Sequence, residues 1–197
     1  MKIKYFLIFL SVFALPFSAC KKNKDNGTVC IDGSANFTHL GVGHELKYIF
    51  YSSSSADDTM LIKNISTDSN GTYKSTISFL PSNKTSEVFY HACNKDLFIS
   101  TNNNIDQYGH SWLSLDANIG DSWTRTIDNK RYTYKLYSKN DSITTPVLNQ
   151  NFTACYKFSY QGSSSFFDAD TIYFKPDIGI VYYHGTLSSY ELFSKNF

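Results

Sequence analysis

The chain has 197 residues, a formal net charge of +1, 17% aromatic residues and four cysteines. A nearly neutral chain without a basic block argues against a nucleic-acid partner. The length suits one domain with a substantial core, even after loss of a leader.

Residues 1–19 have the organisation of a secretory signal. Lys2 and Lys4 precede an almost wholly apolar stretch at 5–17, which is shorter than the roughly 20 residues that a membrane-spanning helix needs. We therefore expect residues 1–19 to be a signal peptide that is removed. Loss of its two lysines would change the formal charge from +1 to −1, because every acidic residue follows Cys20.

The end of this leader, LPFSAC, resembles a bacterial lipobox. Small residues, Ser18 and Ala19, precede Cys20, and Phe17 stands where Leu is preferred. The resemblance implies a lipoprotein in which Cys20 becomes a diacylglycerol cysteine and its new amino group takes a fatty acid such as palmitate. Because one acyl chain holds a protein only marginally, two or three are needed for stable anchoring. The alternative is a secreted protein in which Cys20 is an ordinary thiol.

Residues 20–34 are expected to form a lipidated tether ahead of an all-β domain at 35–197. The stretch after Cys20, KKNKDNGT, is polar and rich in lysine, so it has no apolar side chains with which to pack. Lys21 stands where, by resemblance to known sorting rules, an Asp would favour retention at the inner membrane. We therefore expect a lipid anchor in the outer membrane. Asp25 alone does not decide between the periplasmic and the cell-surface face.

Alternation of apolar and polar residues dominates the rest of the chain, and helical spacing never lasts beyond two turns. Residues 52–58 and 101–110 read as exposed loops, and Asp128–Lys130 as the turn of the clearest hairpin. The pattern predicts an antiparallel meander. The predicted strands are 44–52, 60–66, 72–80, 86–92, 96–101, 122–127, 131–138, 151–160, 170–176 and 178–185.

From Gly120 to about Tyr183 the chain resembles a group of uncharacterised Bacteroidetes-type lipoproteins. The resemblance implies one antiparallel, strongly curved sheet or open half-barrel meander, and it brings no known activity. Asn151 departs from the pattern, since a Gly is common there. The residues that carry the likeness are Gly120, Trp123, Pro146, Phe152, Cys155, Tyr173, Gly179 and Val181.

Three cysteines remain once Cys20 is lipidated. An oxidising compartment permits a disulfide, and Cys30 and Cys93 both lie near segment ends in polar surroundings. We expect this pair, with Cys155 left over, although sequence alone leaves the connectivity open.

No set of residues specifies a reaction. His91, Cys93 and Asp96 group three possible metal ligands, but a structural zinc site wants four. Asp168 and Asp170 lack the other ligands of a calcium loop. There is no nucleophile elbow and no phosphate loop. We expect no catalytic residues, no metal, no cofactor and no enzymatic activity; a hydrolase is the alternative.

The aromatic residues are the remaining candidates for function. Across a concave sheet they could hold a lipid tail or stack on sugar rings, or they could simply form the core. We expect a non-catalytic binding module for a lipid-like or glycan ligand; the alternative is a structural or accessory subunit of a cell-envelope protein complex. The candidate ligand-facing residues are Tyr48, Phe50, Phe89, Tyr132, Tyr134 and Tyr182, with Tyr183 and Tyr190 as further members.

Overall fold

The computed structural model describes residues 34–52, 55–67, 72–100, 113–127, 130–162, 170–185 and 188–197. The predicted leader, nearly all of the predicted tether, the predicted lipidation site Cys20 and the predicted loop 101–110 lie outside these residues.

The described residues form one antiparallel sheet of twelve strands, preceded by two short 3₁₀ turns, η1 (Ser34–Asn36) and η2 (Thr38–Leu40). The predicted all-β class and the single curved sheet are confirmed. The strands are β1 (Glu45–Ser52), β2 (Ser55–Thr67), β3 (Thr72–Leu80), β4 (Lys84–Cys93), β5 (Asp96–Ser100), β6 (Leu113–Ser114), β7 (Ser122–Ile127), β8 (Lys130–Thr144), β9 (Asn151–Gly162), β10 (Asp170–Lys175), β11 (Gly179–His184) and β12 (Ser188–Lys195).

Several strands are longer than predicted. The largest differences are in β2, which begins at Ser55 inside the stretch predicted as a loop, and in β8, which continues to Thr144. The short β6 and the longer β12 were not predicted; in β12, Glu191 interrupts the apolar pattern. Glu191 is nevertheless fully buried, and the groups that donate hydrogen bonds to its side chain come from other parts of the chain.

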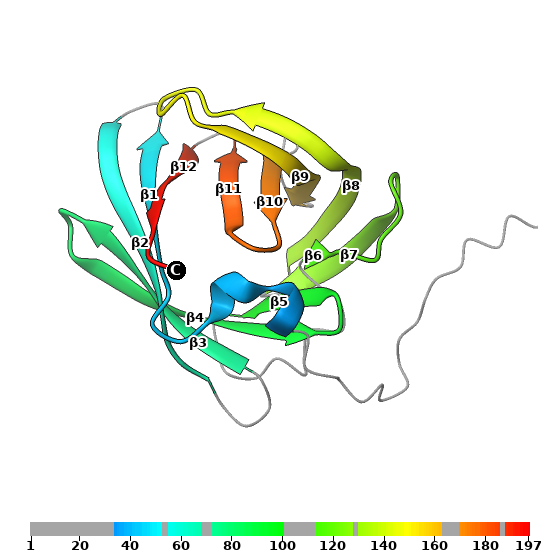
Figure 1. Ribbon diagram of the computed structural model, residues 1–197, viewed down its shortest axis with the longest axis horizontal. Helices are drawn as coiled ribbons and strands as arrows, with labels where there is room; N and C mark the ends of the chain where they lie inside the picture. The colour runs from blue at the N-terminus through cyan, green and yellow to red at the C-terminus, as the bar shows by residue number, and fades with distance from the viewer. Residues whose placement is uncertain are drawn as a thin grey trace, which may run out of the picture.

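The strand order is β6-β5-β4-β3-β2-β1-β12-β11-β10-β9-β8-β7. Neighbouring strands follow one another in sequence except where β1 pairs with β12, which joins the start of the domain to its end. The sheet curls until its two edges, β6 and β7, stand close to the connection 115–121 that links them (Figure 1). β6 and β7 do not pair with each other, so the sheet remains open.

Residues 115–121 bridge the two edges of the sheet. The Leu115 amide donates to the Lys95 carbonyl at the β4–β5 turn, at 2.8 Å. On the other side, the Gly120 amide donates to the Leu136 carbonyl of β8, also at 2.8 Å. Gly120 has φ +95°, a conformation that favours glycine, which accounts for the Gly in this position.

Bulges supply the curvature. The register between β8 and β9 shifts three times, between Leu136 and Ile143, and Ala154 on β9 has φ +55°. Such irregularities bend a strand and increase its twist. The far part of the β8–β9 hairpin therefore leaves the sheet and lies over the convex face, where the amides of Val147 and Leu148 donate to the Glu191 carboxylate of β12.

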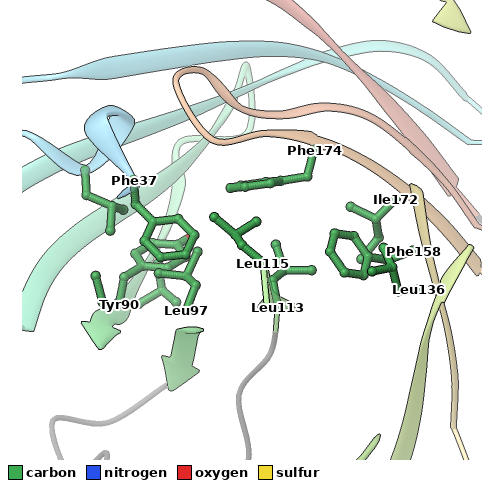
Figure 2. Packing of buried hydrophobic residues seen from close by; sticks show 12 residues of the cluster. Phe37, Tyr90, Leu97, Leu113, Leu115, Leu136, Phe158, Ile172 and Phe174 are labelled. Carbon is green, nitrogen blue, oxygen red and sulfur yellow. The ribbon is translucent and has the colours of Figure 1, made fainter. Parts of the chain in front are cut away.

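The concave face is packed with apolar side chains. Leu97 and Leu113 come from one edge of the sheet, and Phe158 and Phe174 from the opposite wall; all four are fully buried (Figure 2). These side chains meet across the interior, so the curved sheet encloses a core on this side.

The segment before β1 seals one end of this core. Phe37, which lies between η1 and η2, and Leu40, which ends η2, have 0% and 1% of their surface exposed and belong to the same cluster. We call the end at which η1, η2 and the start of β1 lie the plugged end, and the opposite end, where β1 finishes, the mouth. Because neighbouring strands run in opposite directions, each connection between two strands lies at either the plugged end or the mouth.

The cysteines differ in state. Cys93, at the end of β4, is disulfide-bonded. Cys155 is a free thiol, fully buried beside Tyr173 and Val181. Because Cys30 lies outside the described residues, its pairing with Cys93 stays a prediction.

Candidate functional site: an aromatic mouth

The interior near the plugged end leaves little room. His39 is 6% exposed, its ring meets Phe174 edge-on at 5.5 Å, and its Nδ1 lies 3.4 Å from the Pro176 carbonyl oxygen. Burial, more than any other effect, lowers the pKa of His39 to about 4, so the ring is neutral near pH 7. The Asn64 side-chain amide donates to the His39 carbonyl at 2.8 Å and fixes the plug to β2.

An internal cavity of about 30 Å³ remains between the plug and the sheet, lined by His39, Asn64, Tyr48 and Tyr90 among others. This volume is enough for about one or two water molecules and far too small for an acyl chain. The described residues of the interior therefore do not offer a lipid cavity at this end.

A second, shallow hollow lies outside the plug. Its volume is about 310 Å³, at the lower limit of ordinary ligand pockets. One of its charged side chains, Lys95, already pairs with Asp116 at 2.9 Å. Tyr156 is its one aromatic residue, so it does not match the aromatic-lined pocket that the sequence predicts. The lining residues are Ala35, Asn36, Thr38, Lys95, Leu115, Tyr156, Pro176 and Asp177.

Tyrosines form a row across the other part of the concave face. Ring centroids are 5.2 Å apart for Tyr48 and Tyr190, 4.7 Å for Tyr190 and Tyr183, 6.2 Å for Tyr183 and Tyr160, and 5.8 Å for Tyr160 and Tyr134. The last three pairs are stacked. The row thus crosses the sheet from β1 to β8, with each ring supporting the next.

Exposure increases along the concave face from the plug to the mouth. Phe37, Leu97, Phe158 and Phe174 at the plugged side have no exposed surface, whereas aromatic side chains closer to the mouth are only half-buried. Most of these side chains pack against the buried clusters, and all of them keep part of their surface exposed. We call this set the aromatic mouth: Phe50, Phe79, Tyr132, Tyr160, Tyr183 and Tyr190.

A carboxylate lies within the aromatic mouth. The Tyr183 hydroxyl donates to Oδ2 of Asp170 at 2.7 Å, and the hydroxyl oxygens of Tyr160 and Tyr183 are 2.9 Å apart. The Tyr160 hydroxyl also interacts with the Asp170 side chain. The three groups therefore form a connected chain of hydrogen bonds around the carboxylate.

Both phenols of this chain stay protonated near neutral pH. Burial raises the pKa of Tyr183 far above its usual value, and the hydrogen bonds to Tyr160 and Asp170 raise it further. Burial likewise raises the pKa of Tyr160. Neutral hydroxyls beside a carboxylate and aromatic rings are suited to hydrogen-bond a polar ligand, and they include no nucleophile activated for a reaction.

The structure brings four of the six predicted aromatic residues to the concave face. Tyr48 and Tyr134 are buried in it, with 1% and 2% of their surface exposed, and Phe50 and Tyr132 are half-buried. Phe89 neighbours the core residue Tyr90 on β4, so alternation directs its side chain to the convex face.

Tyr182 also lies on the convex face. It neighbours Tyr183 in β11, its ring is 6.0 Å from Tyr173, and its hydroxyl interacts with Tyr51 and Ser189. The Tyr51 hydroxyl in turn donates to the buried Glu191 carboxylate at 2.9 Å. Tyr182 is thus part of the contacts that hold the β8–β9 hairpin against β12.

Three residues of the site were not predicted as ligand-facing. Tyr160 shares a strand face with Phe158, so alternation in β9 could have included it. Asp170 was considered only as a calcium ligand, and its contact with Tyr183 depends on the register of β9, β10 and β11. Phe79 joins the mouth through Phe50, at 5.9 Å, across the intervening strand β2.

Within the described part of the chain, no group of three or more His, Cys, Asp or Glu side chains is arranged to hold a metal ion. None of its helices is long and apolar enough to span a bilayer. Comparisons with protein-family models, with curated proteins and with solved structures found no match to this chain.

Proposed function

We propose that this protein is a bacterial lipoprotein, anchored in the outer membrane through Cys20, whose β domain is a non-catalytic module that binds a glycan at the aromatic mouth. The anchor is inferred from the leader and the lipobox-like stretch before Cys20. The ligand class is inferred from the aromatic mouth.

One observation carries the choice of ligand. Tyr160, Tyr183 and Asp170 form a chain of hydrogen bonds in a part of the concave face where aromatic rings keep contact with solvent. Sugars present apolar ring faces together with many hydroxyl groups. They are therefore matched by a lining that combines aromatic surface with phenol and carboxylate groups.

The packing favours a glycan over a lipid-like ligand. An acyl chain needs a deep apolar cavity, whereas the plugged side of the interior retains only about 30 Å³. A glycan can bind at the rim of a concavity without entering a cavity of this kind.

Calorimetric titration tests the proposal. Soluble oligosaccharides released from bacterial peptidoglycan and lipopolysaccharide are added to the mature chain, and binding is measured for the native chain and for Tyr183→Phe. The variant removes one hydroxyl and leaves the ring. We expect its affinity to fall about tenfold, since a hydrogen bond contributes roughly 0.5–1.5 kcal/mol.

Tyr137→Phe is a matched control. It removes the same hydroxyl from a neighbouring part of the same sheet, but Tyr137 is exposed and separate from the aromatic mouth. Its affinity should stay within about twofold of the native value. Absence of binding by every oligosaccharide, or equal effects of both substitutions, would refute the glycan proposal.

A structural or accessory role is the second candidate, and one observation favours it. Val147 and Phe193 are 55% and 52% exposed, and Gln150 joins their two segments through a hydrogen bond from Nε2 to the Phe193 carbonyl at 3.5 Å. Exposed apolar side chains on two joined segments can meet a protein partner. Chemical crosslinking of the anchored chain in its own envelope, with and without Val147→Ser and Phe193→Ser, separates this role from glycan binding.

A further inference from the structure

We propose that the plugged end of the domain rests against the lipid bilayer, so that the aromatic mouth faces away from the membrane. This inference rests on the proposed anchor at Cys20. It adds a second contact with the membrane, made by the folded domain itself, and it fixes the direction in which a ligand approaches.

The chain enters the domain at the plugged end. Ser34, the first described residue, begins η1, and Nδ2 of Asn36 donates to the Asn94 carbonyl at the β4–β5 turn, at 2.8 Å. Phe37 and Leu40 follow and are buried in the core. Because these contacts hold the entry point, the membrane anchor must approach the domain from this end.

The length of chain outside the structure limits how the domain can turn. Thirteen residues separate Cys20 from Ser34. Fully extended they span about 45 Å, and a random chain of this length has a mean end-to-end distance of about 20 Å. A domain of this size is about 40 Å across, judged from a radius of gyration near 16 Å. At its mean length the tether spans about half the width of the domain, so it favours an orientation in which the end that carries Ser34 lies near the bilayer; only a nearly full extension would let the opposite end reach the membrane.

Among the described residues, several exposed apolar side chains lie at the same end. Val42 precedes β1 and is 54% exposed, and Ile119 lies in the connection 115–121 and is 64% exposed. Ile65 and Phe193 stand two residues before the plugged-side ends of β2 and β12, with 41% and 52% exposed. Apolar side chains that stand around an entry point tethered to lipid are suited to enter the interfacial region of the bilayer.

Charge does not oppose this contact. At the plugged end, Lys63 pairs with Glu45 at 2.7 Å and Lys95 pairs with Asp116 at 2.9 Å. Each pair cancels its own charge, so these four residues neither attract nor repel anionic headgroups strongly. The apolar residues and the tether then determine the orientation.

Photocrosslinking to lipid tests the orientation. The lipidated chain, with acylation of Cys20 first verified by intact mass, is inserted into phosphatidylethanolamine vesicles that carry a diazirine on one acyl chain. Adducts are then mapped by peptide mass spectrometry. We expect adducts on the peptides that contain Val42, Ile65 and Ile119, and severalfold fewer on the peptide that contains Leu80, which is 43% exposed at the mouth.

The double variant Val42→Ser and Ile119→Ser should reduce the plugged-end adducts severalfold, and Leu80→Ser should leave them unchanged. Adducts spread evenly over both ends, or concentrated at Leu80, would overturn the orientation. Adducts that persist in the double variant would overturn the apolar contact. Failure of the anchor itself is recognised earlier, because unacylated material has a different intact mass, and glycan binding is measured separately.

Discussion

Removal of the Phe37 side chain tests whether the segment before β1 is an integral part of the core. Phe37 has no exposed surface, and its ring lies 6.0 Å from Phe174 and 6.3 Å from His39. In Phe37→Ala the lost burial costs about 2 kcal/mol. A remaining cavity of roughly 80 Å³ adds about 2 kcal/mol at about 24 cal/mol per Å³. The free energy of unfolding should therefore fall by about 4 kcal/mol.

Urea denaturation of the mature chain, with the Cys93 disulfide intact, measures this loss. With a typical dependence of about 2 kcal/mol per molar urea, the midpoint should move down by about 2 M. Val42→Ala, in the same segment but exposed, should change stability by less than about 0.5 kcal/mol. A loss below about 1 kcal/mol for Phe37→Ala would show that the segment does not seal the core.

Three further predictions concern buried polar groups. Folding lowers the pKa of His39 from 6.5 to about 4, so the unfolded chain binds more protons than the folded chain between these pH values. The contribution of neutral His39 to the free energy of unfolding should be complete above pH 6.5 and fall by about 3 kcal/mol toward pH 4. In His39→Phe the free energy of unfolding should lack this part of the pH dependence. Glu191→Ala removes the acceptor of the Val147 and Leu148 amides, so the free energy of unfolding should fall by about 3 kcal/mol. Hydrogen exchange at both amides should become faster. Unchanged exchange would contradict the role of Glu191. Burial raises the pKa of Cys155 to about 11. Iodoacetamide should therefore alkylate Cys155 in the folded chain at pH 8 roughly 100-fold more slowly than in the chain unfolded by urea. Equal rates in the two states would refute this prediction.

Alternation made most of the sheet predictable from the sequence. Segments such as 72–80 and 122–127 match β3 and β7 residue for residue, because each strand has one face in the core and one toward solvent. β12 was not predicted because Glu191 lies within it. The hydrogen-bond donors to Glu191 are the Tyr51 hydroxyl and the Val147 and Leu148 amides, which lie at least 40 residues away in sequence.

The plug and the mouth depend on long-range contacts that periodicity does not encode. His39 and Leu40 lie in η2 and Phe37 directly precedes it, so none of the three belongs to an alternating strand. Phe37 and His39 are buried against Phe174, more than 130 residues away. The sequence predicted an aromatic concave face, and four of the six residues named for it lie on that face. Which rings face inward near Asp170 follows from the bulge between Tyr173 and Phe174, and a one-residue shift reverses the side-chain direction.

The aromatic mouth is the centre of this account, and NMR of ring-labelled tyrosines tests it most directly. Envelope oligosaccharides are titrated into the mature chain while the signals of Tyr160, Tyr183 and the exposed Tyr137 are followed. The account predicts saturable shifts for Tyr160 and Tyr183 and none for Tyr137. Binding detected by calorimetry with the Tyr160 and Tyr183 signals unmoved would contradict it.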